Sequence, residues 1–166
     1  MTPQRLFALG AAAAISGGVL RIAAAFIPYA PDSAVLEAFY AVIDLLLLSG
    51  VTAIYLRESG RIGWPGLTAF GVAFAGLASL VGPDKTAFGI DWYQAGAMAA
   101  ALGTAGLGLT LIASRRAILA SIAWVLAPIA AISNVGGDGM FAAGALFGLG
   151  FVFGGAGILM PSSRPA

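Results

Sequence analysis

The sequence predicts an all-α integral membrane protein with six transmembrane helices, and three observations support this fold class. Hydrophobic residues make up 60% of the 166-residue chain and charged residues only 9%, whereas about a quarter of a soluble domain is charged. Apolar stretches near the ~20 residues that cross a bilayer recur along the whole chain. Glycine and alanine are abundant, as in membrane bundles whose helix backbones approach closely.

We predict the six spans at residues 6–27, 35–56, 64–82, 92–113, 117–133 and 139–160. The connections between them are short, so consecutive helices are expected to be antiparallel neighbours. A weak repeat favours three consecutive hairpins, because each even-numbered span opens with aromatic residues and each odd-numbered span follows an arginine. No separate soluble region is left, so residues 1–166 are expected to form a single transmembrane domain.

Polar residues mark the starts of several spans. Ser33 precedes the second span, and Asp138 precedes the sixth. Asp91 precedes the fourth span, with Gln94 three residues later in a pattern close to a capping box. Such side chains accept hydrogen bonds from the free N–H groups of a first helical turn, so we expect them to be N-caps.

The fifth span carries Pro128 near its middle. Proline has no N–H to donate to the carbonyl of Trp124, which frees a backbone acceptor at membrane depth. The indole N–H of Trp124 also requires a partner when it is buried. An ordinarily tolerated proline is the favoured interpretation, and a kink with a nearby polar contact is the alternative.

The basic residues predict the orientation in the membrane. With six spans, every arginine outside the spans falls on one side: Arg5, Arg57, Arg61, Arg115, Arg116 and Arg164. The one lysine, Lys85, falls in a loop on the other side. By the positive-inside rule, both termini are expected in the cytoplasm and the chain in a bacterial-type inner (plasma) membrane.

The chain has no cysteine and no histidine. This excludes disulfides, thiol and imidazole catalysis, Cys/His metal sites and haem held by either residue. A net charge of +1 gives no polybasic surface for nucleic acid. Because no phosphate loop or nucleophile elbow is present either, we expect no cofactor, no metal and no catalytic residue, and we lean against an enzyme.

Arg21 and Asp44 are the charges that lie deep inside predicted spans, where a charge is costly and is usually paired or functional. At 1.5 Å per residue, Arg21 lies ~9 Å and Asp44 ~15 Å below the outer side. Helical side chains lean toward the N-terminus of their own helix, so Arg21 leans inward and Asp44 outward. The two side chains are therefore expected to meet.

Two interpretations of this pair stay open, besides a contact with another subunit. The pair is either an ion pair that joins two helices, or part of an outward-facing polar pocket. In that pocket Arg21 would bind an anionic group and Asp44 would hold or relay a proton. Glu37 and Tyr40 share a helix face with Asp44, and polar residues near the outer ends of later spans either complete the pocket or act as caps. The candidate ligand-binding residues are Arg21, Asp44, Glu37, Tyr40, Tyr93, Gln94 and Asn134.

These features lead us to expect a multi-pass membrane protein that binds or transports a small molecule. The alternative is a non-catalytic accessory or assembly subunit of a larger membrane complex, in which Arg21 and Asp44 form a structural ion pair. An intramembrane enzyme ranks last. Expected partners are membrane lipids, and a membrane protein complex or a homo-oligomer. In style the chain resembles small Ala/Gly-rich multi-pass proteins of bacterial inner membranes, but no motif identifies a family.

Overall fold

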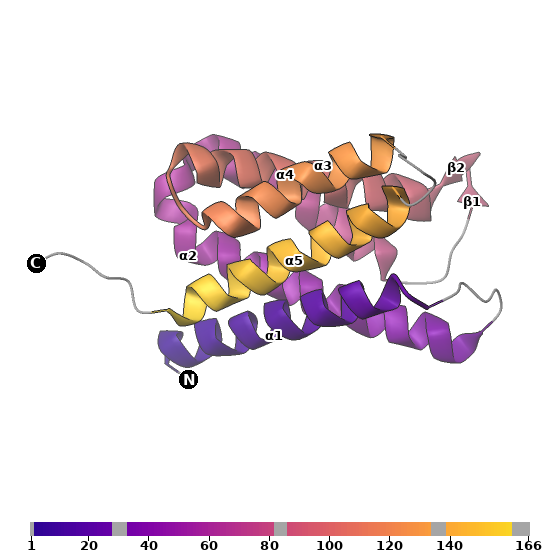
Figure 1. Ribbon diagram of the computed structural model, residues 1–166, viewed down its shortest axis with the longest axis horizontal. Helices are drawn as coiled ribbons and strands as arrows, with labels where there is room; N and C mark the ends of the chain where they lie inside the picture. The colour runs from indigo at the N-terminus through magenta and orange to yellow at the C-terminus, as the bar shows by residue number, and fades with distance from the viewer. Residues whose placement is uncertain (1, 28–32, 82–85, 134–138, 161–166) are drawn as a thin grey trace, which may run out of the picture.

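The computed structural model describes residues 2–27, 33–81, 86–133 and 139–160. In these ranges the predicted all-helical fold class is confirmed (Figure 1). The helices are α1 (Pro3–Ala24), α2 (Ala34–Leu80), α3 (Trp92–Ala113), α4 (Ile118–Ser133) and α5 (Gly139–Leu159). Between α2 and α3, strands β1 (Thr86–Ala87) and β2 (Ile90–Asp91) form a small antiparallel hairpin that pairs Thr86 with Asp91.

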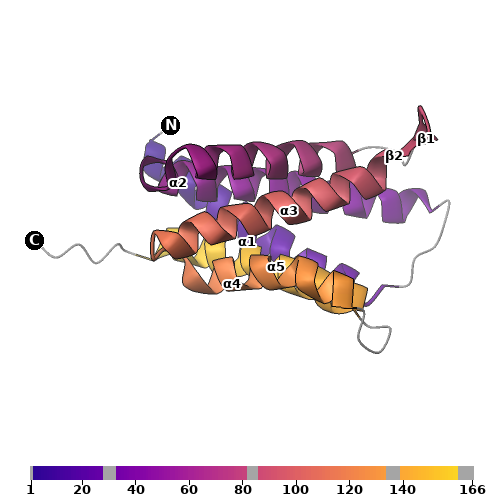
Figure 2. The same cartoon turned by 90° about the horizontal axis from the view of Figure 1, so that it is seen from above.

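Helix α2 spans 47 residues, but it folds back on itself at Gly63. This glycine has φ 53° and ψ −154°, a backbone conformation that residues other than glycine rarely adopt. The rings of Tyr55 and Phe70 stack with their centroids 4.2 Å apart, although an unbroken helix would separate these residues by about 22 Å. The element is therefore two antiparallel arms, residues 34–62 and 64–80, as the view from above also shows (Figure 2).

The seven-residue connection predicted at 57–63 is wrong for all but Gly63, because the helix continues through Ile62. The charges of Arg57, Glu58 and Arg61 favour a loop in a prediction from the sequence. Here these residues remain helical, and Glu58 forms an ion pair with each of the two arginines at the end of the bundle. The other helix ends that the structure describes differ from the prediction by at most three residues.

The helical segments form a closed ring in which neighbours in the chain are neighbours in space. The first arm of α2 contacts α1, the second arm contacts α3, and α4 lies between α3 and α5. A contact between α1 and α5 closes the ring. Figures 1 and 2 show that α1 begins, α2 turns and α5 ends at one end of the bundle, whereas the β hairpin lies at the other.

Glycines allow several of these helices to touch at backbone distance. A Cβ atom at Gly76 would overlap the backbone of Ala100, and one at Gly103 would overlap the backbone of Ala73. These two contacts run in opposite order along the second arm of α2 and α3, so the two helices are antiparallel. Gly71, on the same arm, has no described atom within 4 Å of such a Cβ, so glycine alone does not mark a contact.

Among the described residues, four helices are long and apolar enough to cross a membrane: α1, α2, α3 and α5. Helix α4 is also apolar but has only 16 residues. Large apolar side chains cover the outside of the bundle; Val35 is 82% exposed and Leu119 is 62% exposed. Such a surface fits contact with lipid rather than water. The chain is thus a helical bundle with candidate membrane-spanning helices.

Candidate functional site

Arg21 and Asp44 lie on helices that pack directly against each other. Arg21 is in the last turn of α1, and Asp44 follows buried Ile43 in the first arm of α2. The two helices approach closely one turn before Arg21, because a Cβ at Gly17 would come within 2.9 Å of the Cβ of Leu46. The two deep charges predicted from the sequence are therefore on adjacent helices.

Asp44 is buried, with 8% of its surface exposed. It forms no hydrogen bond, and no ion pair within 4.0 Å, with any residue in the described ranges. Arg21 acts on it electrostatically, but from beyond that distance. Since buried polar groups in proteins are nearly always hydrogen-bonded, Asp44 has acceptor capacity that its described neighbours do not use.

Glu37 and Tyr40 belong to the same continuous arm as Asp44. Glu37 is exposed in the first turn of α2, where a carboxylate complements the positive end of the helix dipole. Tyr40 is half-buried, and its ring lies 5.9 Å from that of Phe39 at the edge of the core. Both residues lie on α2 between Asp44 and the end of the bundle where the β hairpin lies.

Tyr93 and Gln94 lie in the first turn of α3, on the opposite side of the ring from α1. The backbone N–H of Gln94 donates to Asp91 Oδ1 at 2.9 Å, so the predicted N-cap is confirmed. Ser33 likewise caps α2 by accepting from the N–H of Leu36 at 3.4 Å. The ring thus separates the candidates on α3 from Arg21 and Asp44. Asn134 and Asp138 lie outside the described residues.

Trp124 is fully buried, and its Nε1 has no hydrogen-bond partner among the described residues. Its indole edge lies on Gly150, where a Cβ would overlap it, and its ring meets Phe151 edge to face at 5.1 Å. Pro128 lies inside α4, one turn after Trp124. The alternative of a polar contact beside Trp124 is therefore not seen, and the space around the indole is filled by apolar packing.

A cluster of charges at the other end of the bundle was missed from the sequence. The guanidinium of Arg57 donates to the carbonyl oxygens of Ile158 at 2.6 Å and Met160 at 3.3 Å. The last carbonyls of a helix have no partner within it, so Arg57 caps α5 and complements its negative end. Glu58 lies 3.9 Å from Arg57 Nε and 3.5 Å from Arg61 Nη1. The sequence does show a basic residue, Arg57, at the end of a predicted span. It could not identify Ile158, 101 residues away, as the hydrogen-bond partner.

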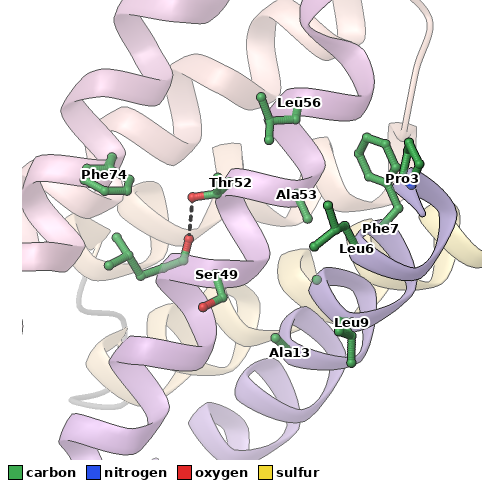
Figure 3. Close-up of a pocket in the computed structure, with 12 residues that line it drawn as sticks. Pro3, Leu6, Phe7, Leu9, Ala13, Ser49, Thr52, Ala53, Leu56 and Phe74 are labelled. Atoms are coloured by element: carbon green, nitrogen blue, oxygen red, sulfur yellow. Dashed lines mark hydrogen bonds between the residues drawn. The ribbon is translucent and has the colours of Figure 1, made fainter. Parts of the chain in front are cut away.

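An apolar groove of about 670 Å³ lies at this same arginine-rich end (Figure 3). Its floor is the first arm of α2 between Leu48 and Leu56, and its walls are α1 and Phe74 of the second arm. The hydroxyl groups of Ser49 and Thr52 bond back to backbone carbonyls of their own helix at 2.8 Å. Arg21 and Asp44 do not line this groove, so the predicted polar pocket and the groove are different places.

No protein-family model, no curated protein and no solved structure matches the chain. Within the described ranges, no group of three or more acidic side chains is placed to hold a metal ion.

Proposed function

We propose that the chain is a six-span inner-membrane protein that binds and transports a small polar molecule at Arg21 and Asp44. The spans are α1, the two arms of α2, α3, α4 and α5, with both termini in the cytoplasm. The positive-inside rule supports this orientation, because Arg5, Arg57, Arg61, Arg115 and Arg116 lie at the end of the bundle where α1 begins, α2 reverses and α3 ends. Helix α4 and the second arm of α2 reach ~25 Å at 1.5 Å per residue, and local thinning of the bilayer accommodates such lengths.

The observation that carries the proposal is the burial of Asp44 without a hydrogen bond or an ion pair to any described residue. A carboxyl group at membrane depth without a hydrogen bond is costly, and ionisable groups in such positions typically mark ligand or proton pathways. Arg21 is near enough to act on Asp44 but does not neutralise it through a direct contact. The pair suits a ligand that presents an anionic group to Arg21 and a hydrogen-bond donor or a proton to Asp44.

The test compares Asp44→Asn, Arg21→Ala and the double variant with the unaltered chain in lipid nanodiscs. A library of small anions, zwitterions and amines is screened by thermal shift, and compounds that stabilise the protein are then tested for uptake into proteoliposomes. We expect each single variant to lose the ligand-induced shift and the uptake. Asp91→Asn is the matched control, since Asn caps a helix as well as Asp and the site is exposed.

Three results would count against the proposal. Asp44→Asn could respond to ligands as the unaltered chain does. The single and double variants could fold equally poorly with no other change, which would make the pair structural. The chain could also prove unstable alone and copurify with one fixed membrane protein, which would support the accessory-subunit alternative.

A further inference from the structure

We propose that the apolar groove binds one acyl chain of an anionic phospholipid, taken from the leaflet at the arginine-rich end of the bundle. The groove does not include Arg21 or Asp44, so this site goes beyond the proposed function. Three properties of the groove carry the proposal: its length, its apolar and laterally open lining, and the unpaired positive charge at its mouth.

The length of the groove matches half of a bilayer. It follows α1 from Pro3 to Ala13 and the first arm of α2 from Leu56 back to Leu48. At 1.5 Å per residue these stretches are ~15 Å and ~12 Å long, against a hydrocarbon core of ~30 Å for two leaflets. A chain that enters at the headgroup level beside Pro3 would therefore lie in the groove through one leaflet.

The lining suits a hydrocarbon chain that enters from the side. Leu6, Leu9 and Leu56 are each more than half exposed, so the groove is open toward the surrounding lipid. The hydroxyl groups of Ser49 and Thr52 are already satisfied by carbonyls of their own helix. A chain lying between α1, the floor and Phe74 would gain dispersion contacts on several sides, whereas a flat helix face offers contacts on one.

The mouth of the groove carries charge that complements a phosphodiester. Arg5 is exposed one helical turn before Leu9, and it has no ion pair or hydrogen bond through its side chain in the part of the chain that the structure describes. The adjacent N-terminus of α1 has no side-chain cap, since Thr2 forms no such bond. Arg5 does not line the groove, but its guanidinium and the positive end of α1 belong to the same first turns of the helix as Pro3 and Leu6, at the level where a headgroup would lie. A zwitterionic headgroup would place its own cation there, so an anionic lipid is favoured.

The experiment measures lipid retention by native mass spectrometry of the full chain after exchange into phosphatidylglycerol or phosphatidylcholine. Ser49→Phe fills the groove, and Ser16→Phe is its matched control. Both serines are exposed, and both hydroxyls bond to the carbonyl four residues earlier at 2.8 Å. Arg5→Gln removes the charge at the mouth, and Arg115→Gln removes an exposed charge outside the groove.

We expect the unaltered chain to retain phosphatidylglycerol in preference to phosphatidylcholine. Retention should fall at least tenfold in Ser49→Phe and about fivefold in Arg5→Gln, since one Arg at an anionic surface contributes about 1 kcal/mol. Both control variants should retain the lipid. If Ser49→Phe lowers the unfolding midpoint, the smaller Ser49→Leu repeats the test. Equal retention of the two lipids, or unchanged retention in Ser49→Phe, overturns the proposal. A change of oligomeric state in that variant with unchanged lipid would assign the groove to a second copy instead.

Discussion

Replacing Gly76 by alanine tests the backbone contact between α2 and α3. The added Cβ would overlap the backbone N and Cα of Ala100, which cannot move aside as a side chain can. Overpacking of this kind costs about 1–3 kcal/mol, whereas Gly→Ala within a helix gains about 0.5–1 kcal/mol. Gly71→Ala, in the same arm, has no described atom within 4 Å and should show only the gain. The difference between the two variants therefore isolates the clash, at about 1–3 kcal/mol.

The assay is unfolding of each variant in mixed micelles by increasing SDS, followed by helical circular dichroism and by tryptophan fluorescence. Gly103→Ala serves as a second probe, because its Cβ would meet the backbone of Ala73 across the same seam. Since both substitutions push the same two helices apart, their effects should not add. Equal stability of Gly76→Ala and Gly71→Ala would refute the antiparallel register described here.

Three further predictions use the same unfolding assay. Arg57→Gln loses charged hydrogen bonds to the end of α5 and should destabilise by about 1.5–3 kcal/mol; no change would mean that the cap is absent. Gly150→Ala places a Cβ on the indole of Trp124, so it should lower stability by about 1–3 kcal/mol and shift the fluorescence maximum. A Cβ at Gly157 would meet no described atom within 4 Å, so Gly157→Ala should change neither the stability nor the fluorescence maximum. A fluorescence shift in Gly157→Ala would contradict the packing of Trp124 on Gly150. Gly63→Ala imposes a side chain on a positive φ and should cost about 1 kcal/mol or more; a stabilised variant would exclude the sharp reversal within α2.

Hydropathy and capping chemistry are local properties, so the sequence could predict most of the helices and two caps. The ends of α3 coincide with the predicted 92–113, and Ser33 and Asp91 cap their helices as expected. The connection predicted between the second and third spans contains the reversal at Gly63 but is too long, because the charges near Arg57 are typical of a loop. In the bundle those charges pair with one another within the helix.

Contacts between helices depend on rotation about each helix axis, and the sequence does not determine that rotation when small residues occur on every face. Gly71 and Gly76 look alike in the sequence, but only Gly76 meets a neighbouring backbone among the described residues. For the same reason the sequence could place Arg21 and Asp44 on adjacent helices but could not determine the distance between their side chains. The partner of Arg57, at the far end of the chain, required the three-dimensional arrangement.

Two of the three carboxyl groups in the first arm of α2, Asp44 and Glu58, have surroundings that differ in a way that stability alone does not explain. Glu58, at the arginine-rich end, has two arginines within 4.0 Å, whereas the deeper Asp44 has none among the described residues. A buried charge is costly when it has no partner, so an arrangement serving stability alone would pair both groups. Removing an unsatisfied buried charge often stabilises a protein at the expense of its activity. Asp44→Asn is therefore expected to resist unfolding as well as or better than the unaltered chain while it loses the ligand response, a combination that a structural ion pair would not produce.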